Sequence, residues 1–333
     1  MIRPVGPVPG DRVQAFQIET APHRGRLVRM GPVLDRCLGR HAYPLPVARL
    51  LGETVVSATA LAATLKCDGV FTLQLKGTGP VSLMVADVLS GAAGSSDDDA
   101  EAGREVRGYA RFDAARMAAV GEAGGNSGGA NPDGMPLSGL LGEGWLAFTV
   151  DQGPDTERYQ GIVALSGDTL AECIAHYFRQ SEQLSTGLRV AVTRGPDGWR
   201  GAALLLQRLP DRGHAGGSDD DGRESWQRAM VLMATLTADE LLDPRLEDHE
   251  LLYRLFHQEG VRVFAPEAVR AGCRCSRDRV AGVLRSLGWA EVEASMRDGV
   301  VEVVCEFCSA CYQFDRGQLA LAFGDQGVTP WNS

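Results

Sequence analysis

The sequence predicts an α+β fold: an N-terminal β-sheet domain packed with helices, a helical linker, and a small C-terminal domain rich in cysteine. Three observations lead to this prediction. Segments with the two-residue alternation of strands, together with amphipathic helices, occupy the chain as far as residue 209. Helical patterns follow up to Gly260, and five of the eight cysteines then lie between residues 273 and 311. The resulting divisions are an N-terminal domain at 1–210, a flexible stretch and helical linker at 211–260, a C-terminal domain at 261–324 and a tail at 325–333.

Length and composition argue against several classes of function. The 333 residues are enough for a full core and a smaller second unit, and the hydrophobic fraction of 44% is that of an ordinary globular protein. The formal net charge is −10, the opposite of the balance in proteins that mainly bind nucleic-acid phosphates. The first twenty residues lack the apolar run of a secretory signal, and no segment approaches the roughly 20 apolar residues of a membrane span. We therefore expect a cytoplasmic protein that binds neither nucleic acid nor membrane and keeps its thiols reduced.

The first elements that the pattern predicts are a helix and a hairpin. Residues 52–65 are rich in alanine and other small residues, which suits a closely packed helix. Residues 70–76 alternate apolar and polar side chains, which predicts a half-buried strand. The turn signal at 77–79 then pairs this strand with a second strand at 80–88. Further strands are expected at 145–150, 158–165, 189–193 and 202–209.

The clearest helix begins after residue 168. Thr169 and Glu172 have the spacing of a capping box, in which each side chain satisfies a backbone N–H of the first turn. The apolar residues behind them recur at helical spacing: Leu170, Cys173, Ile174, Tyr177 and Phe178. Cys173 lies on this stripe, so we interpret it as a buried packing residue.

Three stretches rich in glycine and aspartate have almost nothing to bury. We interpret residues 89–104 and 121–136 as flexible surface insertions, and residues 211–224 as a polar linker stretch. The acidic run Asp219–Asp221 inside that stretch is interpreted as a solvated hinge rather than as a metal site.

Two or three helices are expected after this stretch. Residues 226–236 are strongly apolar, and Thr237 with Glu240 has the spacing of a second capping box. Another helix runs through 251–256 and ends at Gly260. A segment this short cannot form its own core, so its apolar faces must pack against another domain or a partner.

The C-terminal cysteines form two close pairs and one further thiol. They are Cys273 and Cys275, Cys305 and Cys308, and Cys311. A helix at 278–287 and a strand at 300–304 are expected between the pairs, and another strand at 312–314 after them. Two close pairs at this separation predict a closed Zn²⁺ site with four thiolate ligands. Such a site contributes on the order of 10–16 kcal/mol to ordering a domain that has little core of its own.

The narrow first pair favours a site that opens. Without a metal, Cys273 and Cys275 can close only a small, strained disulfide ring, and strained disulfides are the labile, regulatory kind. Cys311 leaves the ligand set open, because it can replace Cys308 or be a spectator. We expect it to be a non-ligand, since the chain should already be returning into a strand there. Four sulfurs leave no position for water, which argues against a hydrolytic zinc.

The cysteine pattern and several N-terminal segments together resemble a known family. The segments are Arg24–Val28, Tyr43–Pro46, 63–80 (ATLKCDGVFTLQLKGTGP), 158–184 and 204–207. With the C-terminal Cys-X-Cys and Cys-X-X-Cys pairs, they are similar to the redox-regulated chaperone family called heat-shock protein thirty-three. The resemblance covers nearly the whole chain. The stretches rich in glycine and aspartate look like insertions relative to the family, and Cys311 is not expected from its pattern.

The resemblance implies an ATP-independent holdase that is inactive when reduced and zinc-bound. Oxidants such as hypochlorous acid, or peroxide with mild heat, would convert nearest-neighbour cysteines to two disulfides, release Zn²⁺ and unfold the linker. On this chain the ligands would be Cys273, Cys275, Cys305 and Cys308, and the disulfides Cys273–Cys275 and Cys305–Cys308. The oxidised protein would be a homodimer that binds unfolding client proteins, and the reduced protein a monomer. The apolar linker residues suited to unspecific clients are Trp226, Met230, Leu232, Met233, Leu252, Leu255 and Phe256.

Two other functions fit parts of the same sequence. A thiol–disulfide oxidoreductase would use Cys305 and Cys308, but such a pair should open a helix in a βαβ unit, whereas this pair follows an expected strand. A zinc-ribbon nucleic-acid module would use local basic residues, which no aromatic platform accompanies. These are Arg270, Arg274, Arg277 and Arg279. No Ser-His-Asp set or phosphate loop can be assembled and the six histidines are scattered, so we expect no enzyme.

Overall fold

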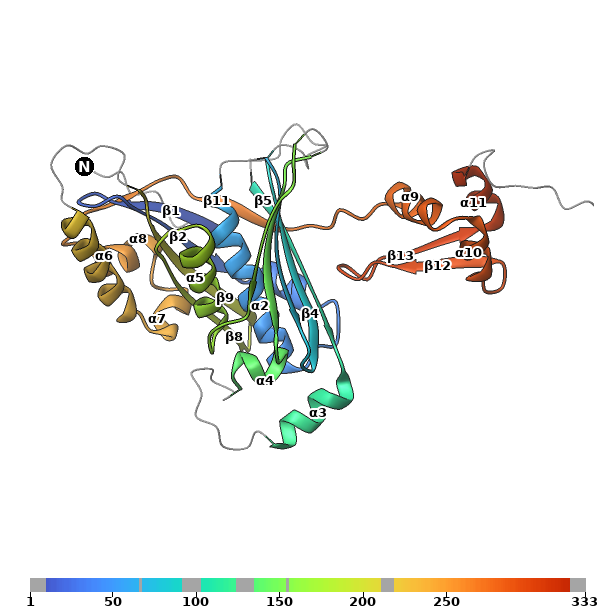
Figure 1. Cartoon of the computed structure of the whole chain (residues 1–333), viewed down its shortest axis with the longest axis horizontal. Coiled ribbons are helices and arrows are strands. Elements are labelled where there is room, and N and C mark those ends of the chain that lie inside the picture. The colour runs from blue at the N-terminus through green and yellow to red at the C-terminus, as the bar shows by residue number, and fades with distance from the viewer. Residues whose placement is uncertain are drawn as a thin grey trace, which may run out of the picture. The chain divides into compact units, whose positions relative to one another are not determined.

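The structure, a computed structural model, describes residues 10–65, 68–91, 103–123, 135–153, 156–210 and 219–323. Its contacts divide the chain into a sheet unit, Met1–Gly272, and a cysteine unit, Cys273–Ser333. The sheet unit contains an 11-stranded sheet with helices, and the cysteine unit a two-stranded sheet with helices (Figure 1). The predicted α+β class is therefore confirmed. Residues outside the described ranges make up most of three predicted stretches: the insertions at 89–104 and 121–136, and the polar stretch at 211–224.

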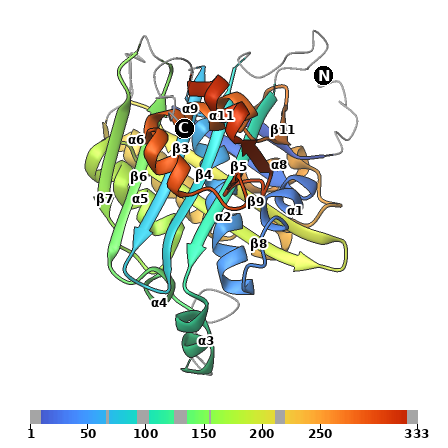
Figure 2. The ribbon, with the colours of Figure 1, turned by 90° about the vertical axis from the view of Figure 1, so that its right-hand side faces the viewer.

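The large sheet has the strand order β7-β6-β3-β4-β5-β11-β1-β2-β9-β8, and β10 also pairs with β1. Figure 2 shows β7, β6, β3, β4 and β5 side by side. Neighbouring strands are antiparallel except β5 and β11, which are parallel. The strands are β1 (Arg12–Ile18), β2 (His23–Met30), β3 (Gly69–Gly77), β4 (Val81–Ser90), β5 (Gly103–Phe112), β6 (Gly144–Asp151), β7 (Tyr159–Ala164), β8 (Thr186–Gly195), β9 (Gly198–Arg208), β10 (Val261–Val263) and β11 (Glu267–Ala271).

Strand β11 joins the two halves of the sheet. It lies between β5 and β1, with Ala268 opposite Gly103 on one side and Arg12 on the other. Gly103 permits the close approach, because a Cβ there would lie 2.9 Å from the Ala268 carbonyl oxygen. Arg104 of β5 donates to the Glu267 carboxylate at 2.9 Å and holds β11 from the side. The sequence suggests a C-terminal domain from residue 261 on, but β10 and β11 belong to the large sheet. The strands with which they pair are far away in the sequence.

Helix α2 (Leu45–Ala62) is the central helix of the sheet unit. It contacts strands of both halves of the sheet, among them β4, β5, β8 and β9. Its approach to β5 is close, since a Cβ on Gly108 would lie 2.7 Å from the Val55 side chain. Among the described residues α2 alone is long and apolar enough to span a membrane, but 83% of its apolar window is buried inside the protein, as in a core helix. The other helices that pack with this sheet or follow its strands are α1 (Pro32–Leu38), α3 (Ala114–Ala123), α4 (Leu137–Leu141) and α5 (Leu170–Ser181).

The elements predicted for this unit are present, with shifted ends. The expected hairpin is β3 and β4, the four further strands are β6 to β9, and the alanine-rich helix begins at Leu45 instead of Gly52, with Pro44 as its N-cap. Thr169 caps α5 by accepting from the Glu172 N–H. The Glu172 carboxylate accepts from the Asp168 N–H at 2.8 Å, so only the first half of the predicted capping box forms.

The linker helices pack on the face of the sheet opposite α2. They are α6 (Asp219–Ala234), α7 (Ala238–Leu242) and α8 (Asp248–Phe256). The alternation of β9 separates the two cores: Ala203 and Leu205 belong to the core of α2, and Leu204 and Leu206 to the core of the linker helices. Because both faces of β9 are covered, the strand is apolar at consecutive positions.

Two sequence predictions for the linker have opposite outcomes. The prediction of a hinge at Asp219–Asp221 is wrong, because these residues form the first turn of α6. Thr237 and Glu240 form the complete capping box that their spacing predicts.

Asp248 anchors α8 to the sheet through two arginines. Its carboxylate accepts from Arg12 at 2.6 and 2.8 Å and lies 3.3 Å from Arg29 Nε. Arg29 also donates to the carbonyl oxygens of Asp243 and Leu246, in the turn before α8. All three charged side chains are largely buried, and that of Asp248 is only 10% exposed. The linker is therefore tied to β1 and β2 by charge as well as by apolar packing.

The Gly25 position in β2 leaves no room for a side chain. A Cβ there would lie 2.0 Å from the ring of Phe16, which is fully buried and stacks on Phe256. Gly25→Ala is expected to lower the free energy of unfolding by about 1–3 kcal/mol, because overpacking forces the ring or the strand to shift. The control is Gly31→Ala, whose Cβ would meet only the Trp199 carbonyl oxygen at 3.7 Å. Urea unfolding measures both variants, and equal stabilities would contradict the packing argument.

His23 of β2 is a buried, neutral contact of helix α6. The Ser225 hydroxyl donates to the Gly222 carbonyl at 3.0 Å, so His23 Nε2 is the donor in its 3.2 Å contact with Ser225 Oγ. The other ring nitrogen, Nδ1, is buried without a hydrogen-bond partner, and the ring meets Trp226 edge-on. Burial lowers the pKa of His23, and the nearby Arg208 cation also lowers it, whereas Glu259 raises it.

This burial predicts a loss of stability in mild acid. The unfolded chain binds a proton on this histidine below about pH 6.5, and the folded chain does so only at a lower pH. The contribution of His23 to stability is therefore fully present above about pH 6.5 and is lost as the pH falls toward the lowered pKa of the folded state. His23→Leu is expected to remove this part of the pH dependence, whereas substitution of the exposed His249 is not. Urea unfolding of the unmodified chain, His23→Leu and the His249 variant at about pH 7 and about pH 5 measures this pH dependence. The same pH dependence in all three proteins would contradict the assignment.

Candidate metal centre

The cysteine unit brings together two cysteine pairs from different segments. Cys273 and Cys275 lie on an extended segment between β11 and α9, and Cys305 and Cys308 lie in the turn between β12 and β13. Hydrogen bonds from the Cys305 N–H to the Ala310 carbonyl and from the Ser309 N–H to the Cys305 carbonyl close that turn. The elements of the unit are α9 (Arg277–Leu287), α10 (Trp289–Ala294), β12 (Val300–Val304), β13 (Cys311–Asp315) and α11 (Arg316–Phe323).

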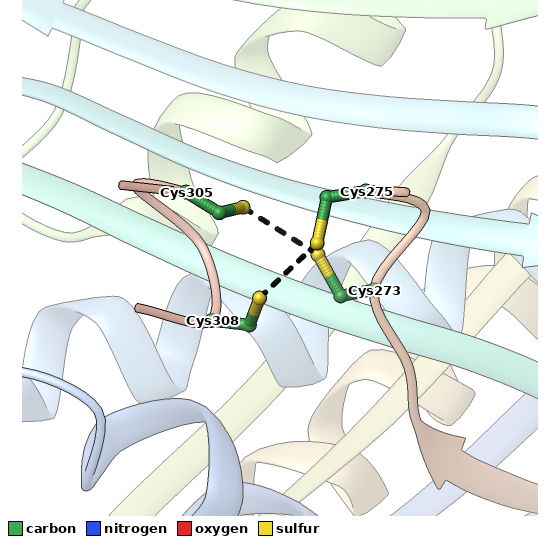
Figure 3. Close-up of side chains that lie close together, drawn as sticks. All are labelled: Cys273, Cys275, Cys305 and Cys308. Carbon is green, nitrogen blue, oxygen red and sulfur yellow. Dashed lines mark hydrogen bonds between the residues drawn. The ribbon is translucent and has the colours of Figure 1, made fainter. Parts of the chain in front are cut away.

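The four sulfur atoms of these pairs converge (Figure 3). Each cysteine offers one Sγ, and the four atoms lie within 4.8 Å of one another. The Sγ atoms of Cys273 and Cys305 are 3.7 Å apart, and those of Cys275 and Cys308 are 3.3 Å apart, so these contacts join the pairs crosswise. A disulfide requires about 2.05 Å between sulfurs, and all four residues are free thiols.

This donor set fits a metal ion. Four sulfurs at about 2.3 Å from a central Zn²⁺ form a tetrahedron with edges of about 3.8 Å, close to the separations observed here. Burial raises the pKa of the Cys308 thiol to about 12, and hydrogen bonds with the neighbouring thiols add to the rise. Four thiolates at this spacing therefore require a cation that neutralises them. The geometry and the sulfur ligands together indicate a closed site with no position for water.

Only a small apolar core supports this centre. Its buried side chains, in the part of the unit that the structure describes, are Leu284, Val292, Val301, Phe314 and Leu319. Arg277 adds a cation–π contact, with its guanidinium 4.3 Å from the centre of the Phe314 ring, and donates to the Gln313 carbonyl at 2.7 Å. A core of this size supplies little folding free energy, so the unit needs a cross-link.

Two residues beside the centre have different relations to it. Cys311 is the first residue of β13, is exposed, and lies outside the four-sulfur group. Desolvation, followed by the nearby Glu302 carboxylate, raises the pKa of Cys311, which keeps this thiol protonated. The hydroxyl of Tyr312, by contrast, donates to Cys275 Sγ at 3.1 Å. The sequence marks Tyr312 only as a strand residue, because no motif distinguishes it.

The surroundings of the second pair differ from a thioredoxin-type site. Cys305 and Cys308 lie in a strand–turn–strand segment, whereas a redox-catalytic pair lowers its thiol pKa by opening a helix. The arginines considered for nucleic-acid binding are partly used inside the unit, since Arg277 donates to Gln313 and Arg279 to the Arg274 carbonyl.

The other described cysteines are buried. Cys37 and Cys173 are 5% and 1% exposed, the latter on the apolar stripe of α5 as predicted. Burial raises the pKa of Cys37 to about 12 and also raises that of Cys173. Cys67 lies outside the described residues. Oxidants that need a thiolate therefore meet little competition from Cys37 and Cys173.

The linker residues proposed for clients are brought together in one cluster with the sheet. Four are buried there, namely Met233, Leu252, Leu255 and Phe256. Trp226, Met230 and Leu232 are partly buried and pack against the same cluster. Their partners on the sheet include Phe16, Leu204 and Leu206. In this structure these residues therefore perform core packing.

Comparison with known proteins agrees with this architecture. The model of the Hsp33 protein family matches residues 11–315. The 33 kDa chaperonin of Caulobacter vibrioides is 40% identical over 310 residues, which cover 92% of this chain and 95% of the relative. That of Ectopseudomonas mendocina is 39% identical over 319 residues, covering 95% and 96%. The crystal structure of the 33 kDa chaperonin from Thermotoga maritima has the same fold, with a TM-score of 0.73 at 22% identity over 94% of this chain and 97% of that one. The chain therefore belongs to the Hsp33 protein family.

Proposed function

We propose that this chain is an ATP-independent holdase chaperone that is inactive when reduced and metal-bound and is activated by oxidation of its cysteine centre. The observation that carries the proposal is the four-sulfur centre in a unit with little core, joined directly to a strand of the large sheet. The name 33 kDa chaperonin of its relatives supports the chaperone part. The proposed metal is Zn²⁺, held by Cys273, Cys275, Cys305 and Cys308. When bound, it neutralises the four thiolates and cross-links the two segments that carry them.

Oxidation removes the ligands by forming two disulfides, which we assign to Cys273–Cys275 and Cys305–Cys308. In each pair one sulfur attacks a peroxide oxygen, the O–O bond breaks, and a sulfenic acid forms while hydroxide leaves. The second sulfur attacks the sulfenic sulfur, the S–S bond forms, and the hydroxyl group leaves. The two sulfurs lose two electrons in total, and two protons from solvent complete two water molecules. Disulfide sulfurs carry no negative charge, so the centre loses its ligands.

The linker is the segment that this loss would free. Helix α8, β10 and β11 follow one another along the chain, and β11 ends just before Gly272 and Cys273. We propose that unfolding of the cysteine unit weakens the pairing of β11 in the sheet and thereby destabilises the docked linker helices. The cluster of the linker and sheet would then offer clients its adaptable side chains, among them Met230, Met233 and Phe256.

We propose a monomer in the reduced state and a homodimer after oxidation, acting in the cytoplasm on unfolding proteins. Reducing cytoplasmic conditions would keep the thiolates available until oxidative stress occurs. We also propose that the protein has no catalytic activity and binds neither nucleic acid nor membrane.

The test compares metal content and suppression of client aggregation before and after peroxide treatment at mild heat. We expect one Zn²⁺ per reduced chain, its release on oxidation, and a gain of holdase activity together with dimer formation. Cys311→Ser serves as the control and should behave like the unmodified chain. Retention of the metal, or its loss without a gain in holdase activity, would contradict the switch. Disulfide mapping by mass spectrometry tests the pairing, since crosswise Cys273–Cys305 links would overturn that assignment alone.

A further inference from the structure

Tyr312 links the C-terminal hairpin to the first cysteine pair. It lies in β13 opposite Val303 of β12, and its ring packs against the small core of the cysteine unit. Its hydroxyl donates to Cys275 Sγ at 3.1 Å. Cys275 lies on the extended segment before α9, so this contact joins two segments that share no strand pairing.

We propose that Tyr312 is a positioning residue that holds Cys275 toward the metal and lowers the reactivity of its sulfur with oxidants. The inference rests on the metal centre of the proposed function and adds a residue outside the ligand set. Cys275 Sγ lies 3.3 Å from Cys308 Sγ, so in the metal-bound state the negative charges of two ligands would be close together. A donor on Cys275 disperses the negative charge that such closeness concentrates.

Two physical effects follow from this hydrogen bond. Groups that hydrogen-bond a metal ligand fix its orientation, and their loss typically lowers metal affinity about 10–100-fold. The same bond engages a lone pair of the sulfur. In the oxidation described above, that sulfur must offer a lone pair to a peroxide oxygen, so it reacts more slowly while the hydroxyl is bound. The protons and electrons of the step are unchanged; Tyr312 affects only its rate.

The neighbourhood allows the hydroxyl to be tested without moving the segment. Arg277, two residues after Cys275, is held separately by its hydrogen bond to the Gln313 carbonyl and its contact with the Phe314 ring. Tyr312→Phe keeps the ring in the core and removes only the O–H donor. Cys311→Ser is the matched control, because it changes the adjacent residue, which lies outside the four-sulfur group.

The experiment uses the full chain loaded with Zn²⁺ and, as a spectroscopic probe, with Co²⁺. For Tyr312→Phe we expect about 10-fold weaker Zn²⁺ binding in competition with a chelator. We also expect faster Zn²⁺ release by peroxide. The sulfur-to-cobalt charge-transfer band should move to longer wavelength while the d–d bands stay in place, since the charge on sulfur changes and the tetrahedral geometry does not. A general loss of packing would instead alter the d–d bands, so this pattern separates the proposed role from a merely structural one.

Unchanged affinity, release rate and charge-transfer energy in Tyr312→Phe would overturn the inference. If that variant does not fold, NMR of the unmodified zinc-loaded chain decides: a Tyr312 hydroxyl proton protected from exchange supports the bond, and a freely exchanging one overturns it. An unmodified chain that binds no metal would overturn the centre itself. The unmodified chain and the Tyr312→Phe variant could instead bind metal equally well and both become active holdases on oxidation. That result would support the proposed function and contradict only the role of Tyr312.

Discussion

Removal of the metal by a chelator under reducing conditions is expected to unfold the cysteine unit and leave the central core of the sheet unit folded. The reason is the disparity between the two cores. The cysteine unit buries only a handful of apolar side chains, whereas α2 and the strands around it form an extensive core. Binding of Zn²⁺ to four thiolates is worth on the order of 10–16 kcal/mol, more than such a small core supplies. Proteolysis should then cleave residues 273–323 rapidly and spare the strands of the large sheet.

A variant with both second-pair cysteines replaced provides the control for this experiment. Cys305→Ser with Cys308→Ser should show the cleavage pattern of the chelated chain from the start, and chelator should change nothing further. Adding Zn²⁺ back to the unmodified chain should restore protection. A cysteine unit that stays resistant to protease without metal would show that its apolar core suffices, and would contradict the account of the centre.

Replacement of Asp248 is expected to have the second largest effect. Asp248→Ala leaves Arg12 and Arg29 buried without their carboxylate partner, and breaking a buried network in this way costs about 3–5 kcal/mol. The loss falls on the docking of α8, so the reduced, metal-bound variant should already suppress client aggregation in part. Urea unfolding gives the stability change, and a light-scattering assay of a heat-denatured client gives the activity.

Charge pairing predicts how this variant is rescued. Glu250→Ala, an exposed change in the same helical turn, is the control and should alter neither stability nor activity. Replacing Arg12 and Arg29 by leucine in the Asp248→Leu chain should recover part of the stability. The buried charges are then gone, but the Asp243 and Leu246 carbonyl oxygens lose the donors that Arg29 supplies. An Asp248→Ala chain as stable as the unmodified one would show that the network does not hold the linker.

Much of the fold can be predicted from local sequence patterns. The parts that cannot be predicted in this way are those that depend on residues far away in the sequence. The hairpin of β3 and β4 and the amphipathic helix α5 are visible in the sequence because alternation and capping are local signals. Strand β11 is not visible in the sequence. Its five residues form a strand because they pair with β5 and β1, which are far away in the chain. For the same reason the sequence suggests that the C-terminal domain begins before the sheet has ended.

The centre shows the same division between local and distant information. The four cysteines are evident from their spacing, and the structure brings their sulfurs together. The hydrogen bond of Tyr312 and the network of Asp248 escape sequence analysis, because each joins residues whose types and spacing form no motif. Both contacts involve the elements that the proposed switch would move.

The most direct test of the central claim is hydrogen exchange of the full chain, reduced and after peroxide treatment at mild heat. We predict that peptides from residues 273–323 and from α6, α7 and α8 lose protection together on oxidation, while those from α2, β3 and β4 keep it. The activated sample should be the one with the exposed linker. Linker helices that remain protected in a sample that has released its metal and become an active holdase would contradict the claim.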